Sequence, residues 1–304
     1  MKRTFRRVFA AVLSAYLFSI PVLAADTLIP VGQVVGLELS SGVVTVAAYD
    51  DAGSPARDAG LQIGDEILAI DGREIHSAAD VRHALNRSGG SVELLVSREG
   101  GQTQLRLEPA ISPEGPRLGI FLRQGITGLG TVTFFDPDTG SFGTLGHGVN
   151  DSCGALLSMT EGKVYPAEVI SIQKGKSGTP GQLRGSLDGS RLLGRLSKNS
   201  QQGVFGTVCA HWTGQPLPVA APCEVRTGAA TIRSTIDETG PRDYSVEILK
   251  IYPADRANGR NLLLRVTDPS LLAATGGIVQ GMSGSPIIQD GKLVGAVTHV
   301  CVFG

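Results

Sequence analysis

From residue 118 onward, short apolar segments alternate with glycine-containing turns, and this pattern limits the possible fold class. The 304-residue chain contains 41 glycines, and only 5% of its residues are aromatic. Frequent glycine between short apolar runs favours many strands joined by tight turns over a helical bundle. The sequence therefore predicts a mainly β protein.

The first 25 residues are typical of an export signal or a membrane anchor. Four basic residues lie within the first seven positions, and residues 8–25 carry no charge and end in small residues. Pro21 interrupts this apolar segment, which is short for a membrane-spanning helix, so we expect cleavage near Ala24 or Ala25. An uncleaved segment that holds the protein at the membrane is the alternative. In both cases we expect the remaining chain to lie outside the cytoplasm.

Removal of this segment leaves about 280 residues, enough for two domains of ordinary size. The net charge of −1 and the absence of a basic run after residue 25 argue against a nucleic-acid partner. The four cysteines lack the spacing of metal ligands, and we expect neither a metal nor a cofactor. Cys209 and Cys223 bracket a proline-rich turn and could form a disulfide in an exported chain, with free thiols as the alternative.

Residues 31–110 are predicted to form a first, small domain. Within residues 54–72, a Ser-Pro-Ala start leads through Gly-Leu and Gly-Asp turns into a short apolar strand. Ser77 and Asp80 form a capping box that begins a helix over residues 78–87, and two further strands follow. This pattern resembles a PDZ domain, which implies that a peptide binds by adding a strand to its sheet.

The PDZ resemblance also implies a binding loop for the carboxylate of the peptide, formed by Gly36, Leu37, Glu38 and Leu39. The peptide would lie between residues 37–46 and the helix. No Lys or Arg occurs between residues 8 and 56, so a free carboxylate would depend on backbone N–H groups alone. Binding of an internal segment, or of this protein's own second domain, is therefore an equal alternative. A docking module with an empty groove is a third.

A serine turn marks the second domain, which we expect over residues 118–304 after a proline-containing linker at residues 111–117. The turn, Gly-Met-Ser-Gly-Ser-Pro at residues 281–286, precedes a hairpin over residues 287–300. Small residues around a serine let its hydroxyl project and let two backbone N–H groups face a developing oxyanion. A serine endopeptidase is therefore the leading hypothesis. Plain loop chemistry is the alternative, because glycine and serine are common in turns.

A serine nucleophile requires a neighbouring base, and the second domain offers three histidines. His147 follows an apolar strand pair and is flanked by glycines that would expose its ring, so we predict it as the general base. His211 lies in an apolar segment and is expected to be a core or surface residue. The return strand of the hairpin is predicted to form a wall of the substrate pocket through Thr298, His299 and Val300.

A carboxylate should orient the histidine and stabilise its cation. Asp268 precedes Ser283 by 15 residues and ends a predicted strand, which gives it a modest lead. An aspartate next to a proline is also an ordinary turn former. The competing carboxylates are Asp151, Asp188, Asp237, Asp243 and Asp255.

Three runs favour one assignment: Gly-Thr-Leu-Gly-His-Gly-Val at residues 143–149, Val-Thr-Asp-Pro at residues 266–269, and residues 275–300 with the serine turn. Together with the N-terminal segment and the PDZ pattern, they resemble the stage IV sporulation protein B peptidases of endospore-forming bacteria over nearly the whole chain. This resemblance implies a triad of His147, Asp268 and Ser283 on a chymotrypsin-like double β-barrel.

Within the turn, Ser283 fits the Gly-x-Ser-Gly-x-Pro pattern and Ser285 does not, so we assign attack to Ser283. The N–H groups of Gly281 and Ser283 would then form the oxyanion hole. Met282 occupies the place where trypsin-like zymogens carry the aspartate that captures a new N-terminus. Activation by that ion pair is therefore not expected.

The same resemblance implies a signalling protease, secreted from the forespore into the space between the two sporulation membranes. There it would cleave itself and a membrane-bound regulator of an intramembrane metalloprotease, so that a late sigma factor is processed. General envelope proteolysis is less favoured, because quality-control proteases of this class usually place the PDZ domain after the peptidase.

The sequence departs from this family pattern at its C-terminal end, where it stops directly after the predicted pocket-wall strand at Gly304. We therefore expect a second barrel that is truncated, with an unpaired edge that lowers its stability. An exported PDZ adaptor that binds peptides and carries an inert peptidase domain is the alternative function.

Overall fold

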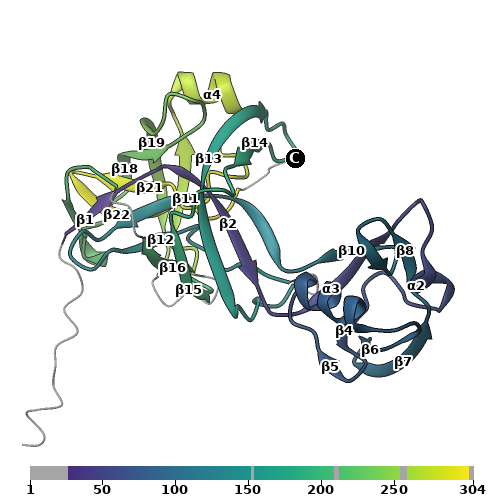
Figure 1. Ribbon diagram of the computed structural model, residues 1–304. Coiled ribbons are helices and arrows are strands. Elements are labelled where there is room, and N and C mark those ends of the chain that lie inside the picture. Colours follow the sequence, from purple (N-terminus) through teal and green to yellow (C-terminus); the bar gives the residue numbers. More distant parts are fainter. Residues whose placement is uncertain (1–26, 152–153, 209–211, 254–258, 301–304) are drawn as a thin grey trace, which may run out of the picture.

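The computed structural model describes residues 27–151, 154–208, 212–253 and 259–300, and these residues form three hydrophobic cores (Figure 1). Two cores belong to the β-rich body at the left of Figure 1, and the third belongs to the smaller domain at the right. The predicted mainly β class is confirmed, since strands make up most of the described elements. Residues 301–304, on which the predicted truncation depends, lie outside the described residues.

The first core fills a closed barrel of six antiparallel strands. Strand β2 pairs with β11 and β13, strand β16 pairs with β12 and β15, and the pairs β11–β12 and β13–β15 complete the ring. Val35, Leu37, Phe135, Phe142 and Val204 are buried inside it. The barrel strands are β2 (Val34–Ser40), β11 (Ile126–Phe135), β12 (Ser141–Thr144), β13 (Glu161–Gln173), β15 (Gly194–Ser200) and β16 (Gly203–Val208).

Three further strands and a 3-10 turn flank this barrel. β1 pairs with β11 and β17, and β14 extends β13 into a long ribbon. Leu183 of β14 is buried in the second core, so the ribbon joins the two halves of the body. The flanking elements are β1 (Thr27–Pro30), β14 (Gln182–Leu187), β17 (Leu217–Pro218) and η1 (Pro222–Glu224).

The second core lies against a five-stranded antiparallel sheet with the order β20-β19-β18-β21-β22. Ile232, Tyr244, Leu271 and Ile287 are among its buried side chains. The hairpin predicted over residues 287–300 is present as β21 and β22, but its return strand ends at Ala296, so residues 298–300 lie beyond it. The elements of this half are β18 (Gly228–Ser234), β19 (Arg242–Ile251), β20 (Leu262–Val266), α4 (Pro269–Thr275), β21 (Pro286–Gln289) and β22 (Lys292–Ala296).

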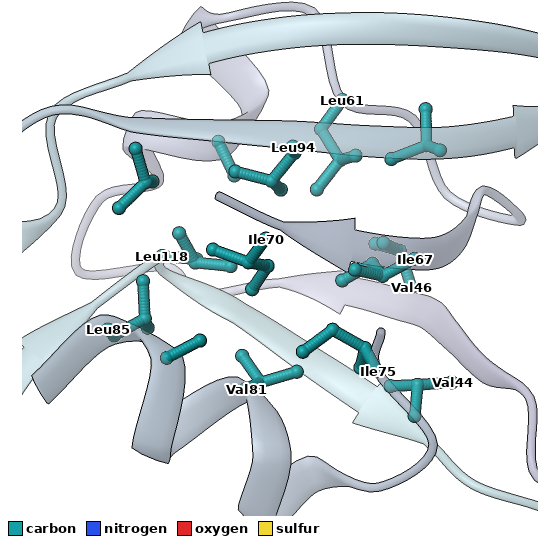
Figure 2. Close-up of a cluster of buried hydrophobic side chains, with 14 of the residues drawn as sticks. Val44, Val46, Leu61, Ile67, Ile70, Ile75, Val81, Leu85, Leu94 and Leu118 are labelled. Atoms are coloured by element: carbon teal, nitrogen blue, oxygen red, sulfur yellow. The ribbon is translucent and has the colours of Figure 1, made fainter. Parts of the chain in front are cut away.

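The smaller domain has a sheet of order β10-β3-β4-β6-β7, with β5 beside β4, and two helices that cover an apolar core (Figure 2). Helix α3 begins where the capping box predicts, because the Ser77 hydroxyl accepts the Asp80 N–H at 3.1 Å. The elements are β3 (Val44–Tyr49), α2 (Pro55–Asp58), β4 (Glu66–Ile70), β5 (Arg73–Glu74), α3 (Ala78–Arg87), β6 (Val92–Arg98), β7 (Gly101–Leu107), β8 (Ala110–Ser112), β9 (Gly115–Arg117) and β10 (Ile120–Arg123).

This smaller domain is inserted into the first barrel, which corrects the predicted boundaries. Strands β1 and β2 precede it in the chain but pair with the barrel strands β11 and β13. The predicted linker, residues 111–117, lies in the β8–β9 hairpin, and β10 pairs with β3 of the small domain. Residues 44–123 therefore form the inserted domain. An alternating apolar pattern predicts a strand but does not tell which of two sheets it joins.

Candidate active site

The serine turn connects α4 to β21, and its conformation requires glycine at position 284. Gly284 has φ +98°, and a Cβ there would lie 1.9 Å from the Thr131 carbonyl oxygen. The half-buried Ser283 places its hydroxyl 3.1 Å from the Thr298 carbonyl oxygen. Ser285 is fully buried, and its hydroxyl bonds the Met282 carbonyl at 2.7 Å. Burial therefore favours Ser283 over Ser285 as the residue that a substrate can reach.

The two backbone N–H groups predicted to bind the oxyanion are not engaged in other hydrogen bonds among the described residues. Within the described part of the chain, neither the Gly281 N–H nor the Ser283 N–H has a hydrogen-bond acceptor. Their peptide carbonyls are held from behind, because Leu183 N–H donates to Gln280 at 2.8 Å and Ser285 N–H donates to Met282 at 3.0 Å. Since a peptide group is planar and trans, a fixed carbonyl directs the N–H of the same peptide to the opposite side. These two N–H groups are therefore fixed in direction and have no described acceptor, as donors to an oxyanion require.

Met282 anchors the turn through apolar contacts. Its side chain is fully buried in the second core, in the same cluster as Ile232 and Ile287. Methionine adapts its shape to irregular spaces in a core. Burial of the Met282 side chain thus holds the turn in place, at the position where a trypsin-like zymogen would carry its aspartate.

His147 lies in the loop after β12 and close to the nucleophile turn. Its Nδ1 is 2.9 Å from the Gly148 carbonyl oxygen, which leaves Nε2 free to take a proton if Nδ1 carries one. The ring centroids of His147 and His299 are 5.3 Å apart. Leu145, two residues before His147, has φ +68°, an uncommon conformation for a branched side chain. Backbone strain of this kind concentrates at functional sites.

The predicted pocket wall lies beside both groups. Thr298 accepts the Ser283 hydroxyl through its carbonyl, and a Cβ at Gly146 would lie 2.8 Å from the Thr298 methyl group. Burial of the ring, with smaller contributions from the neighbouring Arg260 and His147, lowers the pKa of His299. Ser283, His147 and His299 thus converge around Thr298, while Val300 continues the same segment.

The side chain of Asp268 makes its hydrogen bonds at the start of α4 and not to His147. Its Oδ1 accepts the backbone N–H groups of Ser270 at 2.9 Å and Leu271 at 3.0 Å, which caps α4. A hydrogen bond from the Ser270 hydroxyl, with these two N–H groups and that of Ser245, lowers the pKa of Asp268 and keeps it ionised. Asp268 makes no hydrogen bond to His147 in this arrangement, where Nδ1 bonds Gly148 instead. The triad assignment of Asp268 stays a prediction.

The competing carboxylates have partners of their own. Asp188 bonds Ser190, Asp237 bonds Thr239, and Asp243 pairs with Arg233. Asp151 accepts the Ala155 N–H, and Asp255 lies outside the described residues. His211 lies there too. Among the residues that the structure describes, His147 therefore has a backbone carbonyl as its orienting partner.

The predicted carboxylate-binding loop is wrong. Residues 36–39 lie within β2 and pair with β11 on one side and β13 on the other, so no edge remains for a peptide. Within the described residues, the PDZ sheet has β10 at one edge and β7 at the other, and β10 pairs with β3 alone. The Gln124 side chain accepts the Ala78 N–H at 3.0 Å, which ties the end of β10 to the start of α3. A peptide can therefore add to β10 beside this helix.

Sequence reasoning missed two features of this site. The edge strand β10 falls within the predicted peptidase domain, because its short apolar run does not show which sheet it joins. Thr131 holds the nucleophile turn from the first barrel, and a threonine within a strand carries no motif that could reveal this role.

The predictions on metal binding, membrane spans and cysteines can be compared with the structure only within its described residues. Across the described ranges, no group of three His, Cys, Asp or Glu side chains converges to hold a metal ion. No helix within these ranges is long and apolar enough to cross a membrane. Cys223 is an exposed free thiol, whereas its predicted partner Cys209 lies outside the described residues.

Comparison with known proteins identifies partial relatives. A protein named as a DegP-like periplasmic serine endoprotease, from Pseudomonas fluorescens, is 29% identical over 142 residues, which cover 42% of this chain and 29% of that protein. A protein named as a zinc metalloprotease, from Brucella suis, is 30% identical over 109 residues, with 36% and 28% coverage. The chain thus spans less than a third of the length of these relatives.

A solved PDZ domain of an SdrC-like protein from Listeria monocytogenes is 28% identical, covers 26% of this chain and 85% of its own, and has a TM-score of 0.23. Residues 48–98 match the PDZ domain family. Residues 114–303, more than half of the chain, match the family described as SpoIVB peptidase S55. Together with the DegP-like relative, these matches support a serine peptidase that carries a PDZ domain. The chain belongs to the SpoIVB peptidase S55 family.

Proposed function

We propose that this protein is an exported serine endopeptidase of sporulation signalling. It would cleave itself and a membrane-bound regulator of an intramembrane metalloprotease, in the space between the forespore and mother-cell membranes. The observation that carries the peptidase activity is the turn around Ser283, with a reachable hydroxyl and two N–H groups that have no described acceptor. The family match supports the sporulation setting.

In the proposed reaction, the Ser283 hydroxyl attacks the carbonyl carbon of the scissile peptide bond. His147 takes the hydroxyl proton and later donates it to the leaving amine. The N–H groups of Gly281 and Ser283 bind the oxyanion, and Asp268 stabilises the imidazolium cation. Before substrate binds, the Ser283 hydroxyl bonds Thr298, so it must rotate away from that carbonyl towards the base.

The test is labelling by a fluorophosphonate, followed by mass spectrometry to locate the modified residue. We expect the label on Ser283, with no labelling and no self-cleavage in Ser283→Ala. We expect His147→Ala to lower the labelling rate by about three orders of magnitude or more, since triad members act as a unit. Ser190→Ala, which changes a serine in an exposed turn, is the matched control and should label normally. Self-cleavage by purified Ser283→Ala protein would refute the assignment.

A second function, a PDZ adaptor with an inert peptidase domain, is favoured by one observation. The hydrogen bonds of a working triad are not made, because Ser283 bonds Thr298 and Asp268 caps α4. An adaptor would bind a peptide along β10 and leave the fluorophosphonate unreacted. Mass spectrometry of the exported form would also give its N-terminus, and so test cleavage near Ala24.

A further inference from the structure

The nucleophile turn is held through four consecutive carbonyl groups, each of which accepts a hydrogen bond from outside its own peptide. Two of the five donor groups belong to one residue, Thr131. Its hydroxyl donates to Gly281 at 2.8 Å and its backbone N–H donates to Ser283 at 3.0 Å. The four carbonyl groups belong to Gln280, Gly281, Met282 and Ser283.

These bonds fix the orientation of every peptide plane in the turn. The planes that carry the two oxyanion N–H groups are held by Leu183 and Ser285. The planes on the C-terminal side of Gly281 and of Ser283 are held by Thr131. Each plane held by Thr131 shares an α-carbon with a plane that carries an oxyanion donor, so a shift of the first displaces one end of the second. The Thr131 hydroxyl therefore acts on the geometry of the oxyanion hole without facing the substrate.

Thr131 is also fixed on its other side. It is fully buried in the middle of β11, and its carbonyl accepts the Thr144 hydroxyl at 2.7 Å and the Leu145 N–H at 3.3 Å. Thr144 ends β12, and Leu145 begins the loop that carries His147. One residue of the first barrel is thus bonded both to the segment of the nucleophile and to the segment of the base.

We infer that Thr131 is a positioning residue that sets the nucleophile turn relative to the loop of the general base. The inference rests on the proposed roles of Ser283 and His147. Its physical basis is that a displacement of about 1 Å in a catalytic group can cost about 100-fold in rate. A buried hydroxyl with a single acceptor is suited to this task because it has no competing bond to water.

Thr131→Val tests the inference, since valine keeps the shape and the backbone N–H but loses the hydroxyl. We expect kcat and the rate of fluorophosphonate labelling to fall about 10- to 100-fold, with KM changed less than about 3-fold. Thr131→Ser restores the hydroxyl and should return both rates to within about 3-fold of wild type. The matched control is Thr133→Val, a buried threonine on the same strand for which the structure records no side-chain hydrogen bond. It should leave both rates unchanged.

Equal rates in Thr131→Val and Thr133→Val would overturn the inference, and so would a Thr131→Ser variant as slow as Thr131→Val. If Thr131→Val fails to fold, Thr144→Val removes the bond on the opposite side of the same carbonyl. It should lower the labelling rate about 3- to 10-fold.

A measurement without catalysis separates this inference from the proposed function. In a Ser283→Ala background, amide hydrogen exchange of residues 278–286 should be about 10-fold faster with Thr131→Val than with Thr133→Val. Equal exchange would overturn the role of Thr131. A wild-type protein that never reacts with fluorophosphonate would instead refute the proposed function, while the exchange measurement would still decide whether Thr131 holds the turn.

Discussion

Asp268 has one observed role and one proposed role, and a single substitution can separate them. As the residue before Pro269, it caps α4 through the N–H groups of Ser270 and Leu271, and its charge is proposed to stabilise the His147 cation. Asp268→Asn keeps an oxygen for the cap, because asparagine is as good an N-cap as aspartate. We expect the melting temperature to stay within about 2 °C and kcat to fall by about four orders of magnitude.

The control for this prediction is Asp237→Asn, which changes another carboxylate held by local hydrogen bonds, to Thr239, without a proposed catalytic role. It should leave kcat unchanged. Unchanged kcat in Asp268→Asn would mean that Asp268 serves only the helix, and that the Gly148 carbonyl orients the base by itself.

At the scale of the element, the smaller domain depends on an ion pair between the buried Asp65 and the partly exposed Arg98. Asp65 precedes β4 with a side chain only 1% exposed, and it accepts Arg98 Nε at 2.8 Å, Arg98 Nη2 at 2.6 Å and the Gln62 N–H at 2.8 Å. Burial raises the pKa of Asp65, but the bonds from Arg98 and Gln62 outweigh it, so the pKa is lowered. Loss of this carboxylate would leave Arg98 without its partner inside the fold.

We predict that Asp65→Asn lowers the free energy of unfolding of this domain by about 2 kcal/mol at neutral pH. A lowered pKa means that the stabilisation is complete above the unfolded-state pKa of about 3.9 and is lost as the pH falls through the folded-state value. The difference between wild type and variant should therefore shrink below about pH 4. Urea unfolding of the full chain at several pH values measures it.

Asp50→Asn is the control, because Asp50 pairs with Arg117 at the surface, where both side chains are partly exposed. Its effect should stay below about 1 kcal/mol. Equal effects of the two variants would show that burial of Asp65 adds nothing to its pairing.

Elements that local sequence determines were predictable, and elements that depend on distant pairing were not. The cap at Ser77 and the hairpin after Ser283 follow from neighbouring residues, and both are present. Residues 36–39 read as a loop of the PDZ domain because they precede it in sequence. Their actual partners lie in β11 and β13, about 90 to 125 residues away, and no local pattern records such pairing. The contact between Thr131 and Gly281 spans 150 positions and escapes prediction for the same reason.

At the scale of the whole molecule, the PDZ domain is joined to the peptidase by two chain crossings. One runs from β2 to β3, and the other runs from β10 through Gly125 into β11 (Figure 1). Strand β11 therefore begins next to the PDZ edge strand and continues to Thr131 at the nucleophile turn. Because the domain is inserted, its edge strand β10 leads directly into β11, the strand that supports the nucleophile turn.

Gly125 is the point where the two crossings touch, and it gives the last prediction. It has φ +102°, and a Cβ there would lie 2.1 Å from the Leu39 carbonyl oxygen. Gly125→Ala must therefore separate the crossings, and we expect it to cost about 2 kcal/mol or more in stability. Limited proteolysis should then cut between the PDZ domain and β11 faster than in wild type. Gly128→Ala, three residues further on in β11, is the control, since no atom lies within 4 Å of the added methyl group. Equal melting temperatures and cleavage rates for the two variants would contradict a tight crossing, because only Gly125 has backbone in the way of a side chain.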